Sequence, residues 1–134
     1  MPIILSSLDK AILSLDKAIK RSLLNPEDEE VRDAVIQRFE YTYELCIKLL
    51  IRRLKNDAAS SEEIDTMSFR DLIRIGAEKG FIEKAELWFC YREQRNKTVH
   101  IYDERMAHEV YQGVLGFVTD AKLLYEKLLL GNYD

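Results

Sequence analysis

The chain contains very few of the residues that break helices and form tight turns. Of its 134 residues, five are glycine and two are proline. Average usage of these two residue types would give about 16 in a chain of this length. A β-sandwich or β-barrel needs a turn about every 8–12 residues, and most such turns use Gly, Pro or Asn-Gly. The sequence therefore argues strongly against an all-β fold and predicts an all-α fold.

The composition is that of an ordinary globular protein. Hydrophobic residues make up 47% of the chain, which is enough for a packed core and argues against disorder. At roughly 100–200 residues per domain, the length predicts a single domain over residues 1–134. No stretch approaches the roughly 18 apolar residues of a membrane-spanning helix, and the N-terminal apolar run is too short for a signal peptide. We therefore expect a cytoplasmic protein with no membrane partner.

The charge and cysteine content limit the classes of binding site. The formal net charge is −4, which argues against a protein that coats nucleic acid but leaves room for a local basic site. The two cysteines, Cys46 and Cys90, and the two histidines form no zinc-binding pattern, so we expect neither a metal nor a cofactor. Each cysteine lies in an apolar run, and we predict that both thiols are buried.

Helical periodicity defines the first two predicted helices. The sequence SLDKAI at residues 7–12 recurs at residues 14–19, a period of seven that places one apolar seam on a helix. Asn25 is predicted to cap a second helix, with Pro26 at its first position and its end near Lys55. The seam of the first helix consists of Leu5, Leu8, Ile12, Leu15 and Ile19.

The rest of the chain predicts one short helix and two long ones. Residues 56–66 have no sustained period and are predicted to form a loop. Ser68 is predicted to cap a short helix that Gly80 ends. Two further helices are predicted from about residue 83 to the segment 100–102, and over residues 103–128 with an aspartate as its N-cap. Short connections make successive helices antiparallel, so we expect an up-and-down bundle of four long helices plus one short helix.

The segment 92–102 is cationic within an acidic protein. Arg92, Arg95 and Lys97 stand against a single acid, Glu93. We take Arg92 and Lys97 as candidate phosphate contacts, because guanidinium and ammonium groups bind phosphate. The alternative is a solvated, charged end of a helix with no ligand.

The same segment carries groups that can do acid–base chemistry. On an ideal helix Arg92, Asn96 and His100 share one face, and Arg95 lies about 100° around the axis from Asn96. Histidine titrates near neutral pH and can move protons, while asparagine can orient a neighbour. Tyr102 adds a hydroxyl group just beyond His100. The alternative again is a single surface histidine.

These residues resemble a known family. The pattern RN-x-x-x-H-x-Y at residues 95–102 resembles the signature of HEPN-domain proteins, in particular the small bacterial and archaeal ones encoded beside a minimal nucleotidyltransferase. Residues 39–45 (FEYTYEL) with Lys48 resemble the long-helix motif of the nucleotidyltransferase substrate-binding-protein group of that family. Residues 80–82 and 87–88 fit the segment that precedes the signature. The blocks together are specific, whereas either alone would be weak.

The resemblance implies a fold and an activity. Family members are bundles of four to five helices, usually homodimers in which the motif helices of two subunits meet in one cleft. Active members are toxins that act as metal-independent endoribonucleases. For this chain the resemblance implies RNA as substrate, Arg95 and His100 as catalytic residues, and Asn96 as support for the site. Arg92 and Lys97 would then contact RNA phosphates.

The resemblance also implies a partner. The antitoxin of such members is the nucleotidyltransferase encoded nearby, which transfers AMP from ATP onto the motif tyrosine, here Tyr102. An older view treats the helical protein as the non-catalytic substrate-binding subunit of a two-component nucleotidyltransferase. A third alternative is a purely structural bundle.

Other polar and aromatic residues are open to plainer interpretations. Glu40, Glu44, Lys48 and Arg52 follow one another at helical spacing, with Glu44 placed to pair with Lys48. Glu40 and Glu44 therefore belong either to a solvated ridge or to the hydrogen-bond support of the motif. Trp88, at helical spacing with its apolar neighbours, is predicted to be core.

Overall fold

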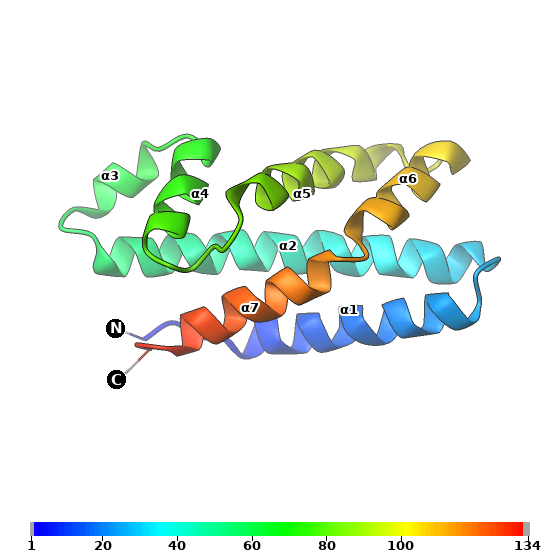
Figure 1. The fold of residues 1–134 in the computed structure, drawn as a ribbon, viewed down its shortest axis with the longest axis horizontal. Helices are drawn as coiled ribbons and strands as arrows, with labels where there is room; N and C mark the ends of the chain where they lie inside the picture. The colour runs from blue at the N-terminus through cyan, green and yellow to red at the C-terminus, as the bar shows by residue number, and fades with distance from the viewer. Residues whose placement is uncertain (1, 133–134) are drawn as a thin grey trace.

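The computed structural model describes residues 2–132, and within them all regular structure is helical, as predicted (Figure 1). None of the helices in this part of the chain is long and apolar enough to cross a membrane. A 3-10 turn, Thr98–His100, follows the fifth helix. The α-helices are α1 (Ser6–Leu24), α2 (Glu29–Asp57), α3 (Ser61–Asp65), α4 (Phe69–Glu78), α5 (Ala85–Lys97), α6 (Glu104–Val114) and α7 (Phe117–Leu129).

The helices form an antiparallel bundle built around α2. This helix contacts each of the other α-helices, with α1 along one side and α5 and α6 along the other (Figure 1). The helix α7 packs on both α1 and α2. The two ends of the chain are joined, because the Ile3 amide donates to Asn132 Oδ1 at 2.8 Å and Asn132 Nδ2 donates to the Ile3 carbonyl at 3.0 Å. The predicted up-and-down bundle is confirmed.

Capping residues explain where the helices begin and end, with one correction. Ser68 caps α4 by accepting the Asp71 amide at 3.2 Å, and Gly80 follows its end with a φ of 86°, as predicted. The predicted cap of α2 at Asn25 is wrong. The cap is Asp28, whose carboxylate accepts the Glu30 and Val31 amides at 2.9 and 3.2 Å.

The segment around Asn25 and Pro26 instead closes the preceding helix. Asn25 is the C-cap of α1, and its side-chain amide donates to the Arg21 carbonyl at 2.9 Å. Pro26 lies in the turn between the helices. An ionised carboxylate is a stronger acceptor for the free amides of a helix start than an asparagine side chain, which accounts for the later start of α2.

Two predicted segments differ from the structure. Residues 56–66, predicted to be a loop, contain α3, a single turn held by the buried side chain of Ile64. The last predicted helix is interrupted at residues 115–116, so that α6 packs on α2 and α5 while α7 packs on α1 and α2. The helix α3 was missed because five residues are too few to show a helical period. The break between α6 and α7 was missed because the apolar spacing from Val114 to Phe117 continues across it.

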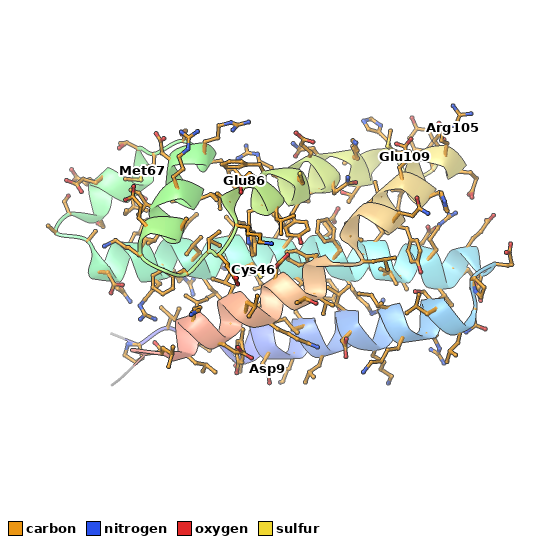
Figure 2. All side chains as sticks on the ribbon, viewed as in Figure 1. Asp9, Cys46, Met67, Glu86, Arg105 and Glu109 are labelled. Atoms are coloured by element: carbon orange, nitrogen blue, oxygen red, sulfur yellow. The ribbon has the colours of Figure 1, made fainter. Side chains whose placement is uncertain are left out.

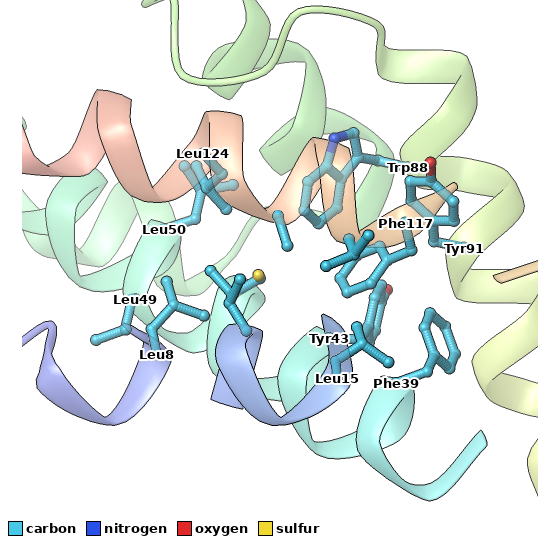
Figure 3. Close-up of a cluster of buried hydrophobic side chains, with 14 of the residues drawn as sticks. Leu8, Leu15, Phe39, Tyr43, Leu49, Leu50, Trp88, Tyr91, Phe117 and Leu124 are labelled. Carbon is cyan, nitrogen blue, oxygen red and sulfur yellow. The ribbon is translucent and has the colours of Figure 1, made fainter. Parts of the chain in front are cut away.

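Aromatic rings form the middle of the core (Figure 3). The ring of Phe117 lies 5.0 Å from Phe39, 4.8 Å from Tyr91 and 5.6 Å from Trp88, in edge-on arrangements that aromatic pairs favour. Tyr43 lies 6.2 Å from the same ring. This cluster joins α2, α5 and α7, and it confirms the prediction that Trp88 is core.

The two cysteines differ in their surroundings. Cys46 is fully buried among the interior side chains, and burial raises the pKa of its thiol (Figure 2). The prediction that Cys90 is also buried is wrong, because its side chain is exposed. The buried face of α5 consists only of Trp88 and Tyr91, and this stripe is too narrow to include Cys90.

Removing the central ring should destabilise the bundle strongly. Phe117 is fully buried, and Phe117→Ala is expected to lower the free energy of unfolding by about 3–5 kcal/mol through the cavity it leaves. Urea unfolding followed by circular dichroism measures this change. As a control, Leu13→Ala alters an exposed side chain and should change stability by about 0.5 kcal/mol or less. Equal effects of the two substitutions would show that the aromatic cluster does not hold the helices together.

Candidate functional site

The end of α5 carries the predicted site residues, and its geometry departs from an ideal helix. The α-helix ends at Lys97, and residues up to His100 form the 3-10 turn. The prediction that Arg92, Asn96 and His100 share one helical face is therefore wrong for His100. Arg92 and Asn96 line a common pocket, whereas His100 is exposed on the turn beyond them.

Arg95 is bound to Glu44 of α2. Its Nη2 and Nε atoms donate to Glu44 Oε1 at 2.6 and 3.0 Å. The predicted pair between Glu44 and Lys48 is thus replaced by a contact between helices. The Glu44 carboxylate raises the pKa of the Arg95 guanidinium further above its usual value. Both side chains remain partly exposed, so solvent and competing anions reach the pair.

Glu40 holds the 3-10 turn in place. The hydroxyl group of Thr98, a residue that is nearly buried, donates to the Glu40 carboxylate and lies 2.8 Å from the Arg95 carbonyl. Glu40 and Glu44 are one turn apart on α2 and contact consecutive parts of the same segment. Two interpretations of these glutamates were open, a solvated ridge or hydrogen-bond support of the motif. The structure shows that both glutamates accept hydrogen bonds from the motif segment. Thr98 itself was not singled out from the sequence.

His100 and Tyr102 lie next to each other at the surface. Their ring centroids are 6.3 Å apart with the planes inclined by 67°. The Tyr102 side chain is 84% exposed, so its hydroxyl group is accessible to another protein. Lys97, the second candidate phosphate contact, is half-buried and is not among the residues that line the pocket beside Arg95.

A pocket of about 590 Å³ lies beside Arg95, between α2, α4 and α5. Its basic lining comes from α2 and α5. Glu44 of α2 was predicted to support the site, but the basic side chains of α2 were not foreseen as part of it. The sequence did show Lys48 and Arg52 at helical spacing, which is the signal that a shared face would give. The basic side chains are Lys48, Arg52, Lys55, Arg92 and Arg95, the other polar ones are Glu44 and Asn96, and the remainder are Tyr43, Ile47, Ile51 and Phe69.

A cation–π contact and a buried phenol belong to the lining of this pocket. The Arg92 guanidinium lies over the Phe69 ring, 4.2 Å from its centroid, in a cation–π arrangement. Burial raises the pKa of Tyr43 to about 12, although Arg92 and Arg95 act in the opposite direction, so this phenol is protonated at neutral pH.

Among residues 2–132, no group of three or more His, Cys, Asp or Glu side chains is arranged to hold a metal ion.

Comparison with known proteins places the chain in a family. Residues 4–129 match the family model described as "Nucleotidyltransferase substrate binding protein like". A Haemophilus influenzae protein named "Probable ribonuclease HepT" is 33% identical over 139 residues, which cover 97% of this chain and 95% of that protein. This degree of identity over nearly both full lengths indicates common descent.

Solved structures agree with this result. One from Haemophilus influenzae, described as the fold of a substrate binding domain of a nucleotidyltransferase, has a TM-score of 0.87 and 30% identity, and covers 94% of this chain and 99% of its own. A second, from Thermus thermophilus, has a TM-score of 0.75 and 28% identity over 90% of this chain and 98% of its own. The chain therefore belongs to the nucleotidyltransferase substrate-binding-protein-like group of the HEPN family.

Proposed function

We propose that this protein is a metal-independent endoribonuclease that acts as a HEPN-type toxin. The observation that carries the proposal is the pairing of an anchored, solvent-accessible Arg95 with an exposed His100 on one short segment. These are the two kinds of side chain that phosphodiester cleavage needs, a fixed cation and an imidazole that can accept or donate a proton. The 33% identical relative named a ribonuclease supports the same activity.

The chemistry follows from the RNA itself. A base removes the proton of a 2′-hydroxyl group, and the 2′-oxygen attacks the adjacent phosphorus. The bond to the 5′-oxygen of the next nucleotide breaks, an acid protonates that oxygen, and a 2′,3′-cyclic phosphate remains. His100 would act as base or acid, and Arg95 would stabilise the negative charge that develops on the phosphorane. Because the substrate supplies the nucleophile, no metal-bound water is required.

One chain carries a single His100 and a single Arg95, so we propose a composite site in the cleft of a homodimer. The His100 of one subunit would serve as base and that of the other as acid. Asn96, with Glu40 and Glu44, would support this site, in keeping with the contacts that Glu44 and Glu40 make to Arg95 and Thr98. Arg92 and Lys97 would contact RNA phosphates on either side of the reaction centre.

The proposed regulation acts on Tyr102. A minimal nucleotidyltransferase encoded nearby would bind the dimer as antitoxin, and the Tyr102 oxygen would attack the α-phosphorus of ATP. Pyrophosphate leaves, the phenol loses its proton, and AMP remains on the tyrosine. The added phosphate is negatively charged and would lie beside His100 and the cations of α5, where it repels RNA. The high exposure of Tyr102 supports this role. We also propose a cytoplasmic location, because the proposed substrate is RNA.

A second function is favoured by the family description and by the solved relative described as a substrate binding domain of a nucleotidyltransferase. In this alternative the protein cleaves nothing and presents a nucleotide to the partner enzyme. It requires a stable complex with the partner and no turnover of RNA by the isolated protein. The first experiment below separates the two.

Removal of the imidazole should abolish cleavage. In buffer with EDTA, the wild type is expected to cut RNA and leave 2′,3′-cyclic phosphate ends, and His100→Ala should be slower by about 100-fold or more. His108→Ala removes an exposed histidine of α6 and should leave the rate unchanged. The measurement is cleavage of labelled RNA on gels, with the ends identified by mass spectrometry. Equal background cleavage by wild type and His100→Ala would refute the nuclease.

Mixed dimers test the composite site. If each cleft needs His100 from both subunits, dimers with one wild-type and one His100→Ala subunit are inactive. Wild type and variant are unfolded together in equal amounts and refolded. The mixture should then give about a quarter of the activity of the same total amount of wild type. Independent sites in each subunit would give about half, and that result would contradict the shared cleft.

The modification site is tested with the partner enzyme. Incubation with ATP and the neighbouring nucleotidyltransferase should add the mass of AMP to the protein and lower its RNA cleavage. Tyr102→Phe should receive no adduct, because the nucleophilic oxygen is gone. Tyr41→Phe, which alters another exposed tyrosine, should be modified like the wild type. An adduct that persists in Tyr102→Phe would assign the modification elsewhere.

A further inference from the structure

We propose that the pocket between α2, α4 and α5 binds an unpaired segment of RNA next to the phosphate that is cleaved. In this arrangement the basic row of α2, defined as Lys48, Arg52 and Lys55, holds backbone phosphates, and the apolar floor of the pocket receives an unstacked base. The inference rests on the proposed ribonuclease function for the nature of the ligand, and it adds where the strand runs and that it must be single-stranded.

The first argument is the charge of the pocket. The basic row follows the spacing i, i+4 and i+7 on α2, so its members share one face over a rise of about 10 Å. Arg92 and Arg95 of α5 face the same pocket, in which Glu44 is the one acidic lining residue. A surplus of positive charge in a concave site of a protein with net charge −4 directs a polyanion to that site.

Two of the five cations already have acidic partners. Arg95 is bound to Glu44 at 2.6 Å, and Lys55 is bound to Asp65 of α3 at 2.5 Å. Glu44 and Lys55 lie near opposite ends of the stretch of α2 that lines the pocket. Arg52 and Lys48, which lie between them on α2, are both exposed, so these cations are available to a ligand.

The second argument is the apolar floor. Tyr43, Ile47, Ile51 and Phe69 line the pocket beneath the charged groups, and the Phe69 ring carries the Arg92 guanidinium at 4.2 Å. An aromatic ring with a guanidinium over it is the kind of surface on which unpaired bases stack. A base within a duplex is paired and stacked, so it has no free face to offer. The floor therefore favours a single strand over a double helix.

The third argument is continuity with the reaction centre. Arg95 belongs both to the pocket lining and to the signature at residues 95–102. A strand that places one phosphate at Arg95 must lay its adjacent nucleotide over the neighbouring surface. A volume of about 590 Å³ lies within the range of sites that hold small organic molecules, and it suits one nucleotide rather than a helix.

The test measures RNA binding separately from cleavage. All variants carry His100→Ala so that the RNA stays intact, and binding of a fluorescent unpaired oligoribonucleotide is followed by anisotropy over a range of salt concentrations. Arg52→Gln should weaken binding and reduce the slope of log K against log salt by about 0.7, the value for one phosphate contact on a single strand. The control Arg21→Gln removes the same charge from an exposed arginine of α1 and should change neither quantity.

The floor is tested with a second matched pair. Phe69→Leu should weaken binding on the order of tenfold without changing the salt slope, because it removes stacking and no charge. Phe81→Leu is the control, since Phe81 is also half-buried and carries Arg53 on its ring at 5.0 Å, but lies outside the pocket. A duplex of the same sequence should bind more weakly than the single strand in every protein.

The outcomes separate this inference from the nuclease proposal. If the wild type does not cleave RNA but binds it in a manner that depends on Arg52, the nuclease proposal is refuted and the pocket is supported. Equal effects of Arg52→Gln and Arg21→Gln, or equal binding of duplex and single strand, would overturn the pocket even if the RNA is cut. Tight binding of free ATP or AMP that the oligoribonucleotide does not displace would also overturn it.

Discussion

Two carboxylates of α2 hold the end of α5, and the geometry of the candidate site depends on them. Glu40 accepts from the nearly buried Thr98, and Glu44 accepts from Arg95 at 2.6 Å. Without such partners a 3-10 turn at a helix end would fray. The aromatic cluster around Phe117 fixes the distance between the two helices, and the carboxylates then fix the rotation of the last turn of α5. Packing therefore sets where the site lies, and hydrogen bonds set the direction of its side chains.

The charge distribution of the chain has a consequence for ligand choice. The protein is acidic overall, with a net charge of −4, yet the pocket beside Arg95 is lined mainly by cations and by apolar side chains. In a protein with a negative net charge, a cluster of cations in a concave site attracts RNA more strongly than the average surface does. Contact with nucleic acid would thus be favoured at this cleft, unlike the contact over a whole face made by proteins that coat RNA. His100 and Tyr102 lie outside the lining of that pocket and are exposed, so they are open to a protein partner.

Most local signals in the sequence were reliable, and signals that needed tertiary structure were not. Ser68 and Gly80 bounded α4 correctly, because capping and a positive φ depend on a few neighbouring residues. Asn25 was predicted to cap the second helix, and only the structure shows that the Asp28 carboxylate takes this role. The motif residues at the end of α5 were found from their spacing. Lys48 and Arg52 were interpreted only as members of a polar ridge with Glu40 and Glu44, since the sequence does not show that α4 and α5 lie beside them.

The ion pair between Arg95 and Glu44 can be exchanged, whereas the contact of Thr98 with Glu40 cannot. A partly exposed pair contributes only about 0–1 kcal/mol, so a substrate phosphate can replace Glu44 on the guanidinium at little cost. The Thr98 hydroxyl is shielded from water, and leaving its partner unsatisfied costs more. The backbone of the motif is thus held firmly while its cation remains available. A site that must accept and release phosphates needs a firmly held backbone and an available cation. Glu44 serves the cation by keeping Arg95 oriented while no phosphate is bound.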